Sequence, residues 1–156
     1  MKQTTLCLLI RENEILLAMK KRGFGVGRWN GAGGKFDSKI DKDILDTAIR
    51  ETKEEIGVEV KNPDKVGLFH FKFANKEEWN QYVYLFLVKE WKGEPTESEE
   101  MMPRWFKIDK IPYKEMWPDD IHWMPHILKG KKLEADFLFG KNDRILDYNI
   151  NIVDEI

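Results

Sequence analysis

Three glutamates fall on one face of a predicted helix. Glu51, Glu54 and Glu55 are three or four positions apart or adjacent, and residues three or four apart lie on the same side of an α-helix. Carboxylates gathered in this way repel one another. A solvated helix face could carry that repulsion, and a hard divalent cation with oxygen ligands would relieve it. The preceding loop, residues 31–35, contains three glycines whose backbone could approach a ligand closely.

The elements that must position these residues are short strands and two helices. Helical spacing of apolar side chains predicts a helix over 43–56, ended by Gly57 in the usual place for a C-terminal glycine. A second helix is expected over 119–128, shortened or bent by Pro125. Apolar or alternating runs predict about seven strands, over 5–10, 15–19, 66–73, 82–89, 104–108, 133–139 and 145–152. This mix indicates an α/β or α+β fold, a mixed sheet with helices packed against it.

The composition is that of a globular chain and excludes several classes of protein. Hydrophobic residues make up 42% and aromatic residues 12% of the 156 positions, more than disordered chains carry. The formal net charge of −2 argues against a protein that wraps a nucleic acid polymer or lies on a membrane surface. The single cysteine, Cys7, excludes an intramolecular disulfide, and we expect it to be buried. We find no linker or repeat, so residues 1–156 are expected to form a single domain.

The glutamate segment resembles the box of the Nudix hydrolase family, G-x5-E-x7-R-E-U-x-E-E-x-G-U, in which U is a bulky apolar residue. Seven of the nine specified positions match: Gly34, Arg50, Glu51, Glu54, Glu55, Gly57 and Val58. Two residues are inserted between Gly34 and Arg50, Lys42 stands where the box has its first glutamate, and Thr52 replaces an apolar residue. We expect the replacement at Lys42 to weaken the anchoring of the loop to the helix more than it affects metal binding.

Further stretches resemble one branch of this family, the MutT homologues that hydrolyse oxidised purine nucleoside triphosphates. They are residues 19–25, 27–31, 98–101, 105–106, 116–120 and 145–148. The Trp-Pro-Asp-Asp stretch at 117–120 is the most diagnostic of the branch. The resemblance implies the Nudix fold, a mixed β-sheet sandwiched between helices.

The resemblance also implies a metal-dependent catalytic set. Its metal would be Mg²⁺, with Mn²⁺ as a substitute, and the implied ligands are the Gly33 carbonyl and Glu51, Glu54, Glu55 and Glu100. Either Glu54 or Glu55 would take the proton from the attacking water. Arg50, the fourth member of the catalytic set, is expected to orient a glutamate rather than to touch the substrate.

A second group of residues is expected to bind a purine. Trp117 lies in a proline-containing loop and could stack on a base, although an ordinary core tryptophan is the alternative. Asp119 and Asp120 suit the first turn of a helix on electrostatic grounds alone. Two carboxyl groups at one site should also have separated pKa values, so that one donates and the other accepts. The resemblance implies that both bind the base edge, with Asn30 on the opposite side. It adds Thr5, Lys20, Phe24 and Phe71 to the pocket, with Phe71 facing Trp117.

The function that these residues imply is hydrolysis of 8-oxo-dGTP, 2-hydroxy-dATP and related nucleotides to the monophosphate and pyrophosphate, which would sanitise the nucleotide pool. Two alternatives stay open at this stage. One is a Nudix enzyme for O6-methyl-dGTP, a dinucleoside polyphosphate or a nucleotide sugar, and the other is a degenerate domain that only binds. Ala18 and Ala32, where relatives carry glycine and phenylalanine, could shift the preference. We expect a cytoplasmic monomer, with a nuclear or mitochondrial fraction, that acts on small nucleotides and engages neither nucleic acid polymers nor membranes.

Overall fold

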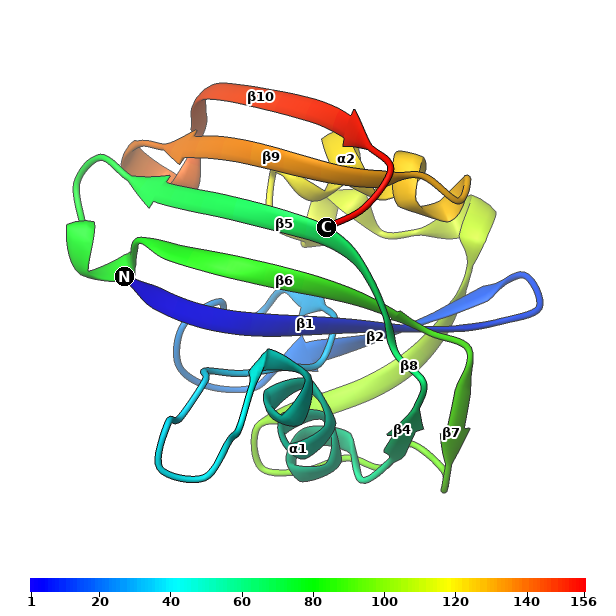
Figure 1. Cartoon of the computed structure of the whole chain (residues 1–156). Helices are drawn as coiled ribbons and strands as arrows, with labels where there is room; N and C mark the ends of the chain where they lie inside the picture. The colour runs from blue at the N-terminus through cyan, green and yellow to red at the C-terminus, as the bar shows by residue number, and fades with distance from the viewer.

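One mixed β-sheet organises the computed structural model, which describes residues 1–156 (Figure 1). The strands follow the order β10-β9-β5-β6-β1-β2-β3, and β8 also pairs with β2. Their bounds are β1 (Lys2–Arg11), β2 (Glu14–Lys20), β3 (Trp29–Asn30), β5 (Asp64–Phe73), β6 (Gln81–Val88), β8 (Met101–Lys107), β9 (Lys132–Phe139) and β10 (Ile145–Val153). The pairs β1–β6 and β5–β9 are parallel, and the other pairs are antiparallel.

The two α-helices cover opposite faces of this sheet, as Figure 1 shows. Successive side chains of a strand point to opposite faces. In β1, Leu8 belongs to the core cluster that includes Trp123 of α2 (Asp120–Leu128), whereas Cys7 and Leu9 belong to the cluster that includes Ala48 of α1 (Ile44–Ile56). The expected sheet between helices is therefore confirmed. Neither helix combines the length and the apolar character needed to cross a membrane.

The sequence of α1 explains both of its ends. The side chain of Asp43 accepts a hydrogen bond from the Asp46 N–H at 2.9 Å, which caps the first turn. Gly57 adopts the left-handed conformation, with φ of 77°, and its N–H donates to the Lys53 carbonyl. The predicted helix is confirmed, and Thr52 is buried although it replaces an apolar residue of the family box.

The strands that sequence patterns missed are the shortest ones. β3 has two residues, and β4 (Glu59–Lys61) and β7 (Glu90–Lys92) have three each and form a separate two-stranded sheet. Elements this short contain too few positions to show alternation. In α2 the structure keeps Pro125 inside a helix of nine residues. Cys7 is buried as expected, and burial raises the pKa of its thiol to about 12.

Candidate active site

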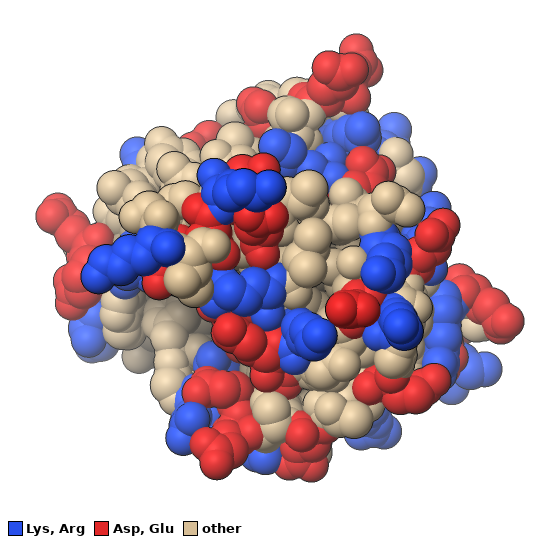
Figure 2. Space-filling view, turned by 60° about the horizontal axis from the view of Figure 1, so that its bottom comes forward, with Lys and Arg blue, Asp and Glu red and all other residues tan.

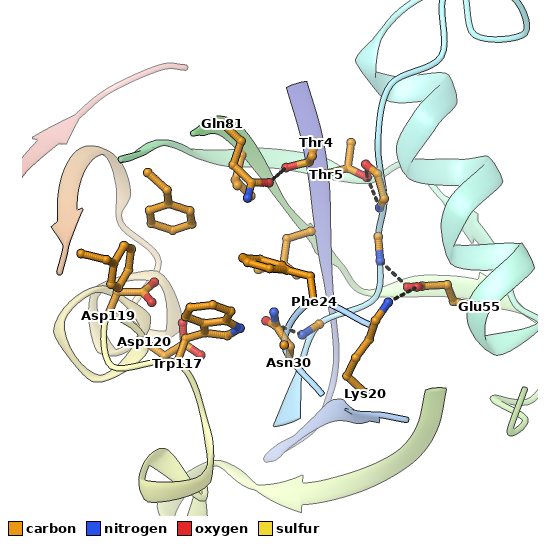
Figure 3. A pocket seen from close by; sticks show the side chains of 18 of the residues that line it. Thr4, Thr5, Lys20, Phe24, Asn30, Glu55, Gln81, Trp117, Asp119 and Asp120 are labelled. Carbon is orange, nitrogen blue, oxygen red and sulfur yellow. Dashed lines mark hydrogen bonds and ion pairs between the residues drawn. The ribbon is translucent and has the colours of Figure 1, made fainter. Parts of the chain in front are cut away.

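A cavity opens between one end of the sheet and the loop that precedes α2 (Figure 3). The cavity has a volume of about 190 Å³ and is open to solvent. Its two ends differ in chemistry. Glu55 and Lys20 lie at one end, and Trp117, Asp119 and Asp120 lie at the other. The structure therefore brings residues from distant parts of the chain to one cavity, as expected.

Glu55 is the helix glutamate that faces the cavity. Only 7% of the residue is exposed. The Gly33 N–H donates to Glu55 Oε1 at 2.8 Å, and Lys20 Nζ lies 3.9 Å from Glu55 Oε2. Burial raises the pKa of Glu55 to about 7, with the charge of Glu51 adding to the effect and the Gly33 N–H opposing it. Glu55 can therefore hold or release a proton near neutral pH.

Arg50 organises the outer side of the same helix. Its Nη1 lies 2.9 Å from Glu51 Oε1 and 3.3 Å from Glu54 Oε2. Glu51 packs against Gly34, where a Cβ atom would collide with the glutamate side chain. Neither Glu51 nor Glu54 lines the cavity. Arg50 thus positions glutamates, and it does not reach the cavity itself.

Asp41 is a site residue that sequence reasoning missed. Arg50 donates to it from Nε and from Nη2, both at 2.8 Å, and the Thr47 hydroxyl donates at the same distance. The Asp37 N–H also donates to its carboxylate, and the hydrogen bonds from Arg50 are the main cause of a pKa well below the usual range for Asp41. Asp41 precedes Lys42, so the loop is anchored to the helix even though Lys42 itself is exposed.

The glycine loop lies against β1 through contacts that only glycine permits. Gly34 accepts a backbone hydrogen bond from Thr5 at 2.8 Å, and its N–H donates to the Thr5 hydroxyl at 3.2 Å. A Cβ atom on Gly33 would collide with the Thr5 carbonyl. This close approach carries the Gly33 N–H to Glu55 and places Thr5 on the cavity wall.

The donor set fits a hard divalent cation, although it is not assembled in advance. Glu100 pairs with Lys20 at 3.4 Å and with Arg22 at 2.8 Å, and Glu54 is occupied by Arg50. No three acidic or histidine side chains are gathered into a ready cage. The set fits a cation because its carboxylates are all negatively charged and repel one another. The charges of Glu51 and Glu100 both contribute to the raised pKa of Glu55. A dication would offset that repulsion.

Trp117 forms a wall of the cavity rather than part of the closed core. The guanidinium of Arg28 lies 4.2 Å from the centre of its ring, and Arg28 Nη1 is held 3.1 Å from Asp143 Oδ2 in the turn before β10. Phe24 contacts the ring at a centroid distance of 5.0 Å, and Phe139 meets it edge-on. Trp117 is therefore fixed in place, with an aromatic surface at the cavity.

Phe71 lines the cavity, but it is not a ring in contact with Trp117. Its nearest aromatic partners are Phe69, Phe137 and Phe139. Gly31 and Gly34 of the glycine loop also line the cavity. The other lining residues were not expected as binding residues from the sequence: Thr4, Leu6, Gly25, Phe73, Gln81, Val83, Met101, Trp123 and Phe139.

Asp119 and Asp120 are buried at the cavity, with 2% and 3% of each residue exposed. Trp123 Nε1 donates to Asp119 Oδ2 at 2.7 Å, whereas Asp120 Oδ2 has no partner. Burial raises the pKa of both carboxyls, and the charge of Asp119 raises that of Asp120 further, to well above its ordinary value. The pair can therefore present one protonated and one ionised carboxyl to a ligand.

The remaining expected residues divide between the cavity and its surroundings. Asn30 lies across from Trp117 in Figure 3, and its Oδ1 accepts the Gly31 N–H at 2.9 Å, which leaves the NH₂ group for a ligand. Lys21 pairs with Glu97 outside the cavity. Ala18 and Ala32, the two positions whose departure from the family pattern could shift the substrate preference, are both buried in the core under α1, and neither lines the cavity.

The fold and this site define the chain as a member of the Nudix family. A model described as the NUDIX domain matches residues 1–127, which include the glutamate helix and the Trp-Pro-Asp-Asp stretch. Strands β9 and β10 lie beyond the matched range and complete the same sheet. Hydrolases of this family use divalent metal ions, in agreement with the donor set at Glu55.

Particular relatives are similar over nearly the whole chain. The mouse protein named oxidized purine nucleoside triphosphate hydrolase is 45% identical, over 96% of this chain and 94% of its own. A zebrafish protein of the same name is 41% identical, over 99% and 97% of the two chains. The crystal structure of a mutator MutT protein from Bacillus halodurans superposes with a TM-score of 0.85 at 28% identity, covering 97% of this chain and 98% of the other.

Proposed function

We propose that this chain hydrolyses oxidised purine (deoxy)nucleoside triphosphates, such as 8-oxo-dGTP and 2-hydroxy-dATP, in a Mg²⁺-dependent reaction. The products would be the nucleoside monophosphate and pyrophosphate, and the role would be to sanitise the nucleotide pool. The observation that carries the proposal is the buried pair Asp119 and Asp120 beside Trp117, in a cavity whose other end holds Glu55. The names of the mouse and zebrafish relatives support the same substrate class.

The base end suits an oxidised purine. Oxidation adds polar groups to the purine edge, so an enzyme that selects these bases needs both donors and acceptors there. A protonated Asp120 would donate, an ionised Asp119 would accept, and the Asn30 amide would complete the recognition from the other side. Trp117 would stack on the base, which is favourable for any purine and leaves selectivity to the polar groups.

The phosphate end suits hydrolysis of a phosphoanhydride. Glu51, Glu54, Glu55, Glu100 and the Gly33 carbonyl would hold Mg²⁺, which when bound neutralises phosphate charge and makes water more acidic. Lys20 would contact the triphosphate from the cavity wall. Glu55 is our candidate for the group that takes the proton from water at its carboxylate, because it lines the cavity and Glu54 does not.

We further propose that residues 1–156 act as a single unit, because residues from β1 through β9 line one cavity, and that the chain acts as a monomer. A cytoplasmic location would suit a substrate drawn from the nucleotide pool. On the face shown in Figure 2, basic and acidic side chains are interspersed, which suits a small nucleotide better than a polyanionic polymer.

Pyrophosphate release from 8-oxo-dGTP and from dGTP, with Mg²⁺, tests the substrate class. We expect a preference for the oxidised nucleotide that is lost in Asp120→Ala, which removes the donor, and a general loss of turnover in Glu55→Gln. The exposed residue Glu99 provides the control Glu99→Gln, which should behave as wild type. Equal slow rates on both nucleotides would refute the oxidised-purine proposal and direct a search among other Nudix substrates.

A further inference from the structure

A polar pair interrupts the apolar wall of the cavity between its two ends. Thr4 Oγ1 lies 3.0 Å from Gln81 Oε1, and both side chains line the cavity (Figure 3). In the parallel register of β1 and β6, Thr4 lies opposite Val83, so Thr4, Val83 and Gln81 share one face of the sheet. That face otherwise contributes apolar side chains such as Phe71 to the cavity. A polar pair at this position requires a partner or solvent.

The surroundings hold the Gln81 amide in one orientation. Gln81 Nε2 donates to the Trp79 carbonyl at 3.2 Å, and Gln81 Oε1 accepts from the Thr4 hydroxyl. One N–H of the amide is left over. The Thr4 hydroxyl has a single hydrogen, which it directs to Gln81 or to the Tyr82 carbonyl at 3.2 Å, so its oxygen can still accept. The pair therefore offers one donor and at least one acceptor side by side, which matches a hydroxyl group.

The chain neighbours of the pair place it between the two ends of the cavity. Thr5, the residue after Thr4, bonds the glycine loop at the Glu55 end. Gln81 lies opposite Phe71 in the register of β5 and β6. In Figure 3, Thr4 and Gln81 lie between Asp119 on one side and Glu55 on the other. In a nucleotide, the group that joins the base to the phosphates is the sugar.

We propose that Thr4 and Gln81 form a specificity-determining pair that binds a hydroxyl of the nucleotide sugar. The inference deepens the proposed function, because it assumes that a nucleotide occupies the cavity with its base at Trp117 and its phosphates at Glu55. It is independent of whether the base is oxidised. Each hydrogen bond to the sugar should strengthen binding by about 3- to 10-fold, and it should affect KM more than kcat because the sugar does not react.

The test combines substitutions in the pair with removal of the hydroxyls. Gln81→Met keeps the size of the side chain and removes the amide, and Thr4→Val removes the hydroxyl, while Thr4→Ser should retain binding. Gln3→Met is the matched control, since Gln3 is the other glutamine, is exposed and lies on the opposite sheet face. The substrates are 8-oxo-GTP, 8-oxo-dGTP, its 2′,3′-dideoxy analogue and unoxidised dGTP. Circular dichroism and thermal melting verify the folding of each variant.

We expect Gln81→Met to raise KM by about 3- to 10-fold for substrates that carry the bound hydroxyl and to leave the dideoxy analogue unchanged. Equal losses on 8-oxo-GTP and 8-oxo-dGTP would assign the 3′-hydroxyl, and a loss on 8-oxo-GTP alone would assign the 2′-hydroxyl. An equal loss on the dideoxy analogue, or no loss on any substrate, would overturn the proposal.

The comparison with dGTP separates this inference from the proposed function. In one outcome, wild type shows no preference for the oxidised base while Gln81→Met still raises KM only for substrates that carry the hydroxyl. That result would support the sugar contact and refute the oxidised-purine function. If wild type prefers the oxidised base and Gln81→Met raises KM equally for substrates with and without the hydroxyls, the oxidised-purine function is supported and the sugar contact is refuted. Affinities for the corresponding monophosphates without metal give the same comparison independently of turnover, and failure of all of them to bind would refute both.

Discussion

The carboxylate of Asp41 receives two hydrogen bonds from the guanidinium of Arg50, from Nε to Oδ1 and from Nη2 to Oδ2, each at 2.8 Å. The Asp41 side chain is 1% exposed, so this bidentate ion pair is shielded from solvent. It ties the loop before α1 to the second turn of the helix, and Arg50 in turn orients Glu51. The pair therefore anchors the loop to the helix in this chain, in which Lys42 stands in place of the first glutamate of the family box.

Replacing Asp41 should therefore reduce stability in a pH-dependent manner. Asp41→Asn leaves Arg50 partly unpaired, and we expect the free energy of unfolding at pH 7 to fall by about 2–4 kcal/mol. The Asp41 pKa is lowered in the folded state, so its contribution is complete above about pH 4 and is lost as the pH falls further. Urea unfolding at pH 7 and pH 3 should show the difference from wild type shrinking at the lower pH. Asp109→Asn, at an exposed site, is the control, and a constant difference would contradict the assignment.

Asp120 should trade stability for recognition. Its pKa is raised in the folded state, so ionisation favours the unfolded chain and wild type loses stability as the pH rises above about 4. Asp120→Asn removes this effect and should become progressively more stable than wild type as the pH increases. Asp120→Ala, which unlike asparagine keeps no donor at this position, should lose about tenfold or more in the ratio of kcat/KM for 8-oxo-dGTP over dGTP. Thermal melting from pH 5 to 8, with Asp154→Asn as the control, measures the first effect. An Asp120→Asn variant that is less stable than wild type at every pH from 5 to 8 would disprove the prediction.

Metal binding should release a proton from Glu55. The pKa of this carboxyl is about 7 in the metal-free protein, so part of the population must lose a proton before Mg²⁺ can bind. We expect the affinity for Mg²⁺ to increase between pH 6 and pH 8 and to do so far less in Glu55→Gln. Calorimetric titration at three pH values measures this. In turnover, Glu55→Gln should lose about 100-fold or more in kcat, and extra Mg²⁺ should restore Glu54→Gln better than Glu55→Gln. If extra Mg²⁺ restored the two variants equally, the assignment of Glu55 as the group that takes the proton from water would be contradicted.

Arg28 and Asp143 should act on the substrate through Trp117. Arg28 stacks on the indole at 4.2 Å and is held by Asp143. Arg28→Met removes the stacked cation and should raise KM for 8-oxo-dGTP by about 3- to 10-fold with little change in kcat. Asp143→Asn should act in the same direction and more weakly, since asparagine tolerates the φ of 58° found there. Arg144→Met, at an exposed position, should leave KM unchanged. A loss confined to kcat would argue against a role in positioning the base.

Local patterns in the sequence predicted much of this site, and contacts between distant segments account for what it missed. Glu51–Glu55 and Trp117–Asp120 are each continuous in the sequence, so their spacing could be recognised from the sequence alone. Gln81 and Thr4 are 77 positions apart and meet only through the register of a parallel strand pair. Asp41 lies in the segment between Gly34 and Arg50, which is two residues longer than in the family box, and position alone pointed to Lys42. The choice of Glu55 over Glu54 as the candidate base depends on which side chain reaches the cavity. The sequence alone does not show which of two adjacent helical residues does so.

The parallel pairing of β9 with β5 bears on when the enzyme can begin to work during its own synthesis. Residues 67–73 pair with residues 133–139. Strand β9 can therefore join the sheet only after the roughly 60 residues between the two segments have been synthesised. Phe139 and the turn that holds Arg28 then close the wall behind Trp117. A ribosome-bound chain that has exposed residues up to Glu100 therefore carries the residues of the phosphate end but lacks Trp117, Asp119 and Asp120 of the base end. Selectivity for the base is thus acquired last, because the chain leaves the ribosome from its N-terminus and such long-range pairing is slow.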